Sequence, residues 1–239
     1  MGEKQYFEYG EAETAFLKSK DMALGKAMDE IGHVQREVIP DIFMALANSI
    51  IGQQISTKAQ ETVWARFLTM FAPVTPVHIL SLPEETLQTC GTSLKKATYI
   101  KEIAGSIVDG CLDLAQLQAM PDDAVCKRLC QIKGIGVWTA EMLMIFSMQR
   151  MDVVSWGDMA ILRGLRMLHR HREITPKLFA KYKKRYSPYG TVASLYLWKI
   201  SHGACGGLVD LAPKTEVQKK ANSKKRGKEI KAPAGKQKK

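Results

Sequence analysis

Residues 131–142, QIKGIGVWTAEM, place two glycines where the backbone could bind an anion. Gly134 and Gly136 separate two segments whose apolar residues recur at helical spacing. Glycine tolerates positive φ and has no Cβ, so the chain can reverse here and approach another surface closely. The second helix would begin with unpaired N–H groups and a partial positive charge, which suit a phosphate. A plain pair of helices with a glycine cap is the alternative.

Asp158, in the stretch VVSWGDMAILRG, is a second candidate for chemistry because a helical run follows it directly. An aspartate in that place would be an ordinary helix N-cap. A helix N-terminus also keeps a carboxylate ionised, as the stabilisation of a developing cation would require. Capping and catalysis are compatible, and the spacing alone leaves both open.

Polar and aromatic side chains elsewhere could meet a ligand. Gln53 and Gln54 lie in a predicted helix break, where they would either bond to helix ends or contact a partner; Ser56 would either cap a helix or bond a phosphate. Aromatic faces attract electron-poor, cationic groups by stacking and cation–π attraction, although aromatic residues lie in cores more often than in pockets. The four tryptophans are Trp64, Trp138, Trp156 and Trp198.

Helices must position all of these residues. Strand signals are few, and amphipathic runs separated by Pro and Gly fill most of the chain, so an all-α protein is expected. A break near 52–56 divides residues 41–71 into two helices, with Asp41 capping the first and Ser56 or Thr57 the second. Further helices are predicted over 12–32, from Pro83, within 91–110, over 113–120, from Pro121, and over 138–148, 161–169, 176–186 and 192–202.

Composition indicates a packed intracellular protein. Apolar residues make up 46% of 239, enough for one domain or two small lobes sharing a core. The polar start is unlike a signal peptide, and no apolar run approaches the roughly 20 residues that span a bilayer. The five cysteines show no CxxC spacing, and Cys126 and Cys130 lack two further ligands nearby, so reduced thiols are expected.

Positive charge is concentrated at the C-terminus. Residues 214–239 hold eleven Lys or Arg and two Glu, or +9 of the net +11. This composition predicts a disordered tail, beginning near residue 211, which would either tether the protein to phosphates or only keep it in solution.

Four segments, in order, resemble the helix-hairpin-helix (HhH-GPD) superfamily of base-excision DNA glycosylases. LCQIKGIGVWTAEMLMIF is similar to its hairpin pattern, L-x-x-(L/I)-x-G-(I/V)-G-x-x-T-A. Asp158 stands where the family carries its catalytic aspartate, about twenty residues past the hairpin. SIIGQQISTKAQ and SPYGTVASLYLWK resemble two further family segments, and together the four cover roughly residues 40–205.

The residue two past Gly136 separates the branches of this superfamily. Members that also cut the strand carry a lysine there, and this chain has Trp138, so lyase activity is not expected. Only Cys205 falls where other members bind an iron–sulfur cluster, so no cluster and no required cofactor are expected. Trp138, the QQIS stretch and the YLW segment are most similar to the 3-methyladenine DNA glycosylase II (AlkA-type) branch. The chain departs from that branch because about 40 N-terminal residues cannot form its extra lobe, and Met142 replaces an aromatic residue.

The resemblance implies a set of site residues. Asp158 would stabilise the oxocarbenium-like sugar, and Trp138 and Trp198 would form the base pocket, with Trp156 as a further candidate. Gln54 would be the wedge that fills the hole left by the flipped base. Backbone carbonyls of the hairpin would hold a monovalent cation, Na⁺ or K⁺. DNA-binding positions are Gln53, Gln54, Ser56, Gly134, Gly136, Trp138 and Thr139, and the carbonyls are those of Cys130, Ile132 and Ile135.

We therefore expect two helical lobes with a cleft between them, acting as a monomer on double-stranded DNA with a damaged base. Residues 37–150 would form the central lobe, with the helix-hairpin-helix at 122–148, and residues 1–36 with 151–210 the second. The expected reaction is removal of alkylated purines, leaving an abasic site, in the cytoplasm at the nucleoid, or in the nucleus of a eukaryote. The alternatives are a glycosylase for oxidised or deaminated purines, and a non-catalytic DNA-binding module.

Overall fold

The computed structural model describes residues 4–213 of the chain. The predicted basic tail lies outside the described residues from position 214 onward. No helix within 4–213 is both long and apolar enough to cross a membrane.

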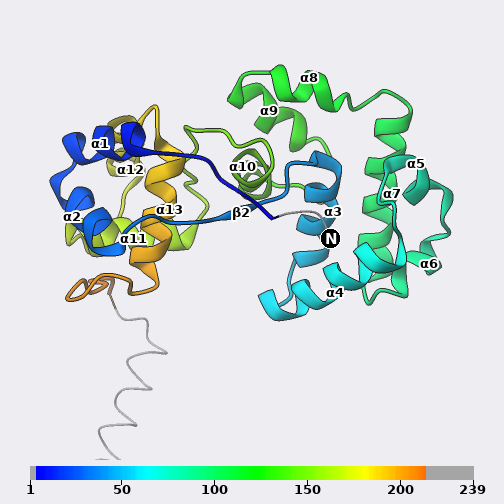
Figure 1. The fold of residues 1–239 in the computed structure, drawn as a ribbon, viewed down its shortest axis with the longest axis horizontal. Coiled ribbons are helices and arrows are strands. Elements are labelled where there is room, and N and C mark those ends of the chain that lie inside the picture. The colour runs from blue at the N-terminus through cyan, green and yellow to red at the C-terminus, as the bar shows by residue number, and fades with distance from the viewer. Residues whose placement is uncertain (1–3, 214–239) are drawn as a thin grey trace, which may run out of the picture.

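The described residues form a mostly helical fold, which confirms the predicted fold class (Figure 1). Two short strands, β1 (Gln5–Tyr6) and β2 (Glu37–Val38), pair antiparallel, with Gln5 opposite Val38. The helices are α1 (Glu11–Lys20), α2 (Met22–Ile31), α3 (Ile42–Gly52), α4 (Thr57–Met70), α5 (Pro76–Ser81), α6 (Glu84–Gln88), α7 (Leu94–Val108), α8 (Leu114–Ala119), α9 (Asp122–Leu129), α10 (Val137–Phe146), α11 (Met159–His169), α12 (Pro176–Tyr186) and α13 (Gly190–Ser201).

Capping residues set most helix starts where the sequence predicts them. The Asp41 carboxylate accepts a hydrogen bond from Met44 N, and Ser56 Oγ accepts one from Ala59 N, so both predicted caps are confirmed. The prediction of one helix over 12–32 is wrong, because the chain breaks at Asp21. Its side chain accepts hydrogen bonds from Ala23 N and Leu24 N and thereby starts α2.

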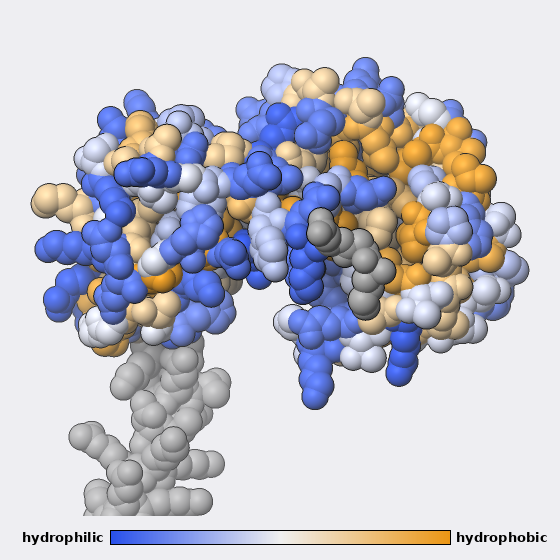
Figure 2. All heavy atoms as spheres, in the orientation of Figure 1, coloured by the Kyte–Doolittle hydropathy of each residue, from blue (hydrophilic) through white to orange (hydrophobic). Residues whose placement is uncertain are grey.

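Two hydrophobic clusters organise the fold. One gathers buried residues from Ile42 to Val153 and is built on α3 to α10. The other gathers α1, α2, α11, α12 and α13 with the strand region, including Val38. Phe146 and Trp198 pack against both clusters, with ring centroids 5.5 Å apart. Figure 2 shows the two masses with a hollow between them on one face.

We propose that these clusters are two lobes, a central one at 37–150 and a discontinuous one at 1–36 with 151–210. The change of cluster between Val153 and Val154 supports the second boundary. Val38 packs with the second lobe although it lies within the proposed central range, because β2 pairs with β1.

Candidate active site

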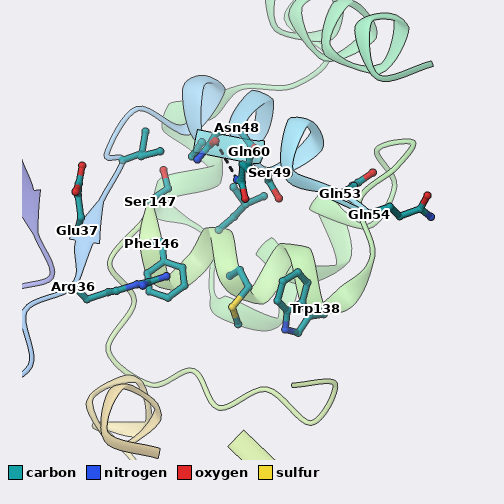
Figure 3. A pocket seen from close by; sticks show the side chains of 15 residues that line it. Arg36, Glu37, Asn48, Ser49, Gln53, Gln54, Gln60, Trp138, Phe146 and Ser147 are labelled. Atoms are coloured by element: carbon teal, nitrogen blue, oxygen red, sulfur yellow. Dashed lines mark hydrogen bonds between the residues drawn. The ribbon is translucent and has the colours of Figure 1, made fainter. Parts of the chain in front are cut away.

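A cavity of about 610 Å³ lies between α3 and α10 (Figure 3). One wall is a stripe of α10: Trp138, Met142 and Phe146 follow at intervals of four residues and therefore share one helix face. The opposite wall comes from α3 and includes Asn48 and Ser49. Other lining residues are Arg36, Glu37, Ile39, Ala45, Gly52, Gln53, Gln54, Gln60, Leu143 and Ser147.

Asp158 is held at both carboxylate oxygens. It is the N-cap of α11, where Oδ1 accepts hydrogen bonds from Ala160 N at 2.9 Å and Ile161 N at 3.0 Å. Oδ2 accepts a hydrogen bond from Trp138 Nε1 at 3.0 Å. The side chain is buried, with 7% of the residue exposed. The predicted capping role is confirmed, and the geometry leaves the carboxylate oriented toward the cavity wall that Trp138 forms.

The tryptophans separate into one cavity residue and two packing residues. Trp138 is 48% exposed and lines the cavity, so its ring connects the cavity to Asp158. Trp198 does not line the cavity; its ring packs against Phe146, which does. Trp156 does not line it either, and packs edge-on against Phe179 at 5.1 Å. The structure thus brings Trp138 to Asp158 but leaves the other two predicted pocket residues outside the cavity.

A second carboxyl, Glu141, lies beside this site and was not found from the sequence. Ser155 Oγ donates a hydrogen bond to Glu141 Oε2 at 2.5 Å, and Ser155 is fully buried three residues before Asp158. Burial raises the pKa of Glu141, and the negative charge of Asp158 raises it further, while the Ser155 bond and Lys183 oppose the shift. Glu141 follows Trp138 by three residues on α10, and that spacing was the available signal.

The glycine hairpin ends in an uncapped helix. Gly134 has φ +85°, and a Cβ there would come within 2.8 Å of the Tyr99 ring, so the hairpin lies closely against α7. Gly136 is the N-cap of α10 and offers no side-chain hydrogen bond to it. No backbone hydrogen bond among the described residues uses the N–H groups of Gly134, Gly136 or Trp138. These amides are therefore free to bind an anion.

The carbonyl oxygens of the hairpin differ in how many of their lone pairs already accept hydrogen bonds. The Ile132 carbonyl accepts a hydrogen bond from Ile135 N at 3.1 Å, which uses one of its two lone pairs. Within residues 4–213 no backbone or side-chain donor bonds the carbonyls of Cys130 and Ile135. The carbonyl oxygens of Cys130, Ile132 and Ile135 therefore all keep lone pairs that could act as ligands. No group of three or more His, Cys, Asp and Glu in the described chain is arranged to hold a metal ion.

The turn between α3 and α4 is tied to the hairpin. Gln53 Nε2 donates a hydrogen bond to the Gly134 carbonyl at 2.7 Å. Lys96 Nζ donates to the carbonyls of Ile51 and Gln53, at 2.8 and 2.7 Å, and so satisfies the open end of α3. Gln54 has φ +58° and is exposed. The structure thus assigns different positions to the two glutamines: Gln53 bonds to the hairpin and Gln54 is presented outward.

Ser56 and Thr139 have limited side-chain freedom. The Ser56 hydroxyl caps α4, and the Thr139 side chain is buried in α10, with 8% of the residue exposed. At the hairpin, Thr139 can offer its backbone amide rather than its hydroxyl.

Comparison with known proteins identifies the family to which this chain belongs. The family model of the HhH-GPD superfamily of base excision DNA repair proteins matches residues 47–188. DNA-3-methyladenine glycosylase 1 of Schizosaccharomyces pombe is 35% identical over 161 residues, which cover 65% of this chain and 71% of that protein.

Solved structures of DNA-3-methyladenine glycosylases resemble this fold. The DNA-3-methyladenine glycosidase of Bacillus halodurans has 35% identity and a TM-score of 0.74, and the match covers 83% of this chain and 93% of that one. The Schizosaccharomyces pombe 3-methyladenine DNA glycosylase Mag1, solved with abasic DNA, has 29% identity and a TM-score of 0.70. This match covers 82% of this chain and 99% of that one.

Proposed function

The chain belongs to the HhH-GPD superfamily of base excision DNA repair proteins, and we propose that it is a DNA glycosylase that removes alkylated purines of the 3-methyladenine type from double-stranded DNA. Two relatives named for DNA-3-methyladenine excision are each 35% identical to it, and together with the site geometry they support this specificity. The relative solved with abasic DNA supports DNA as the partner and an abasic site as the product.

The reaction begins with a flipped nucleotide, because the sugar carbon is unreachable inside the stack. A 3-alkylated adenine carries positive charge and leaves readily, so the sugar develops oxocarbenium character as the glycosidic bond breaks. The Asp158 carboxylate lies close to that charge and stabilises it. Hydrogen bonds at both of its oxygens, from Trp138 and from the start of α11, fix its orientation before the substrate arrives.

The base occupies the cavity against the α10 stripe. The face of Trp138 stacks on a cationic base, and the thioether of Met142 and the ring of Phe146 extend this wall. Trp198 packs against Phe146 and Trp156 packs on Phe179, so both act on the pocket indirectly. Because the Met142 side chain is flexible, this part of the wall is more adaptable than a wall of rings would be.

The DNA backbone lies on the hairpin. The free amides of Gly134, Gly136 and Trp138 bind a phosphate without reading sequence. The carbonyls of Cys130, Ile132 and Ile135 would hold a monovalent cation, which would add positive charge at the hairpin. Gln54, exposed on a left-handed turn, fills the space left by the flipped base, and Gln53 holds that turn against the hairpin. No lysine stands in the lyase position, which Trp138 fills, so the strand stays intact. The protein acts as a monomer. Its location is that of the DNA, at the nucleoid or, in a eukaryote, in the nucleus.

One observation carries this proposal: a buried carboxylate, capping a helix, accepts a hydrogen bond from a ring that lines the cavity. Incubation with a methylated duplex, followed by chromatography of the released bases and gel analysis of the strand, tests it. Free 3-methyladenine with an uncut strand is expected. Binding without release from methylated, oxidised or deaminated duplexes would favour the non-catalytic DNA-binding module instead.

A further inference from the structure

Lys183 is an exposed lysine of α12 beside the loop that ends at Asp158. That loop packs onto α12 through Trp156, whose ring centroid lies 5.1 Å from that of Phe179. Lys183 follows Phe179 by four residues and therefore stands one turn further along the same side of the helix. Its positive charge acts on Glu141 of α10 and opposes the rise in the pKa of that carboxyl. Lys183 thus lies at the rim of the proposed site.

The ammonium of Lys183 keeps its hydrogen-bond donors free. Glu141 attracts it, but the two side chains form no hydrogen bond or ion pair, and no other residue within 4–213 bonds to the ammonium. The nearest oxygen of that carboxyl is already used by Ser155 Oγ, which donates to Glu141 Oε2 at 2.5 Å. Arg185, two residues further on α12, is by contrast bound to Asp21 at 2.9 Å. The attraction of Glu141 therefore favours a position at the rim and leaves three N–H donors for an outside anion.

The hairpin and Lys183 lie on two sides of the Asp158 carboxylate. The hairpin ends at Gly136, where α10 begins. Trp138 follows and donates its hydrogen bond to Asp158. Glu141, on which Lys183 acts, comes one turn later. Gly136 and Glu141 are five residues apart, or about 7.5 Å along the helix axis. Free backbone amides and a free ammonium therefore bracket the carboxylate.

A flipped nucleotide brings two phosphates to this rim, because a phosphate is attached to each side of its sugar. The carboxylates of Asp158 and Glu141 repel these anions, more strongly at a partly desolvated site than in water. The hairpin amides can hold only one of the two phosphates. A nucleotide held at one end can still turn about its backbone bonds, so its sugar would not be fixed against Asp158. A cation at the other phosphate removes both problems.

We propose that Lys183 binds the second phosphate of the flipped nucleotide, the one across the sugar from the phosphate on the hairpin. This inference rests on the proposed glycosylase function and names a further DNA contact of the same site. The ammonium offsets the repulsion between the carboxylates and the DNA. Together with the hairpin, it fixes the sugar against Asp158. A lysine contacts phosphate as a point charge and reads no base, so the range of lesions does not depend on it.

The other lysines of α12 provide a matched control. Lys177, Lys181 and Lys184 recur at intervals of four and three residues and line one hollow on the outside of the helix, which Lys183 does not line. Lys184→Gln therefore removes the same charge from the neighbouring position, on a different face of the same helix.

The test measures affinity for a duplex that contains a tetrahydrofuran abasic-site analogue, over a range of salt concentrations. Single-turnover release of 3-methyladenine is measured at saturating protein. The proteins are the wild type, Lys183→Gln, Lys183→Arg and Lys184→Gln, with melting temperatures to verify the fold. In a second set of duplexes, each phosphate beside the analogue is replaced in turn by a neutral methylphosphonate. This replacement removes the charge that Lys183 would bind and leaves the protein unchanged.

Lys183→Gln should raise the Kd about 2- to 5-fold, the scale of an exposed ion pair. The slope of log Kd against log salt should become shallower by about 0.9, as the loss of one phosphate contact predicts. Base release should slow even at saturating protein, because the sugar is then held at one end. Lys183→Arg should keep affinity and rate, and Lys184→Gln should behave as wild type. Methylphosphonate at one flanking phosphate should weaken wild-type binding without weakening Lys183→Gln further.

A role that acts only through Glu141 predicts a different pattern. If Lys183 merely balances that carboxyl, Lys183→Gln should have no effect in a protein that already carries Glu141→Gln. The proposal predicts that Lys183→Gln raises the Kd by the same factor in both backgrounds.

Three results would overturn the proposal. An unchanged salt slope for Lys183→Gln would exclude a phosphate contact, and equal losses in Lys183→Gln and Lys184→Gln would indicate general attraction to DNA. Losses that multiply at every methylphosphonate position would place Lys183 away from the flipped nucleotide. If the wild type releases no 3-methyladenine, the proposed function fails, while binding of the abasic duplex still decides whether Lys183 holds a phosphate.

Discussion

Trp138 Nε1 lies 3.0 Å from Asp158 Oδ2, so the ring that forms the cavity wall also holds the buried carboxylate. The two residues come from different helices, α10 and α11, separated by a loop of twelve residues from 147 to 158. Oδ1 is meanwhile used by the first amides of α11. In the proposed mechanism, this one hydrogen bond couples base recognition by Trp138 to stabilisation of the sugar cation by Asp158.

Removing that hydrogen bond should slow excision without weakening DNA binding. Trp138→Phe keeps an aromatic face in the cavity but loses the N–H donor, so the carboxylate loses part of its orientation. Single-turnover release of 3-methyladenine should fall about 10- to 100-fold, the scale of a small misplacement of a reacting group. Trp156→Phe is the control, because Trp156 packs on Phe179 outside the cavity. Equal rates for the two variants would mean that the donor does not matter.

Glu141 and Ser155 should act as one unit that positions the loop before Asp158. Ser155→Ala and Glu141→Ala each break their 2.5 Å hydrogen bond, and each should slow excision. The double variant should be no slower than the slower single variant, because contacting residues are not additive. Glu141→Gln keeps an acceptor for Ser155 and should restore most of the rate. If the slowing in the double variant equals the product of the slowing in the two single variants, the two side chains act independently.

Gly134→Ala should weaken DNA binding by displacing the hairpin. The new Cβ would need a positive φ and would meet the Tyr99 ring at 2.8 Å. Gly110→Ala is the matched control, since Gly110 also has positive φ (+73°) but has nothing within 4 Å of its Cβ position. Both changes should cost about 1–2 kcal/mol of unfolding free energy from backbone strain. Only Gly134→Ala should raise the Kd for abasic DNA; the same rise in both would point to strain alone.

Two helical glycines should respond in opposite directions. A Cβ at Gly164 would lie 2.4 Å from the Leu197 carbonyl oxygen, where α11 and α13 pack backbone to backbone, so Gly164→Ala should lower the Tm. At Gly105 in α7 the nearest atom is 3.7 Å away, an ordinary contact. Gly105→Ala should therefore stabilise the protein by about 0.5–1 kcal/mol, the usual helix preference for alanine. Thermal melts of the two variants check both signs, and a stable Gly164→Ala protein would contradict the close packing.

Acid should unfold the second lobe through Asp21. Burial alone would raise the pKa of this carboxyl, but hydrogen bonds with His169 and Arg185 outweigh it and hold the pKa well below its ordinary value of 3.8. A depressed folded pKa stabilises the protein above the unfolded pKa, and this stability is lost as the pH falls below about 4.

Asp21→Asn should therefore flatten the loss of unfolding free energy between about pH 4 and pH 2, measured by urea titration at each pH. At pH 7 it should cost about 3 kcal/mol, because it leaves Arg185 and His169 without their anion. Asp29→Asn, at an exposed pair with Lys18, should keep the wild-type slope. An unchanged slope for Asp21→Asn would assign the acid sensitivity to other carboxyls.

Local signals in the sequence were enough to predict most of the helices and two parts of the site. The glycines of the hairpin and the cap at Asp158 each depend on a few neighbouring residues, which a pattern can show. The break at Asp21 was missed because the apolar spacing runs through it. Only the packing of α12 makes it clear why that aspartate is buried, through Arg185 and Tyr186.

Contacts between distant segments could not be predicted in the same way. Glu141 meets Ser155 across a loop, and Arg36, just before β2, meets Phe146 from more than a hundred residues earlier, so neither pair has a local pattern. Trp198 was predicted to face the base because it matches a pocket position of the family, and Trp156 because aromatic faces suit a cationic base. The sequence did not show which face of α13 turns toward the cavity, nor where the turn before Asp158 directs Trp156.

The most direct test of the central claim compares the wild type with Asp158→Asn on a duplex that contains 3-methyladenine. Asparagine can still cap α11, so the fold should be retained, and equal melting temperatures would verify this. We predict that single-turnover base release falls by at least about a hundredfold, the effect of removing one preorganised electrostatic group, while DNA affinity is unchanged or higher. Release at the wild-type rate, or a loss of binding equal to the loss of release, would contradict a catalytic role for Asp158.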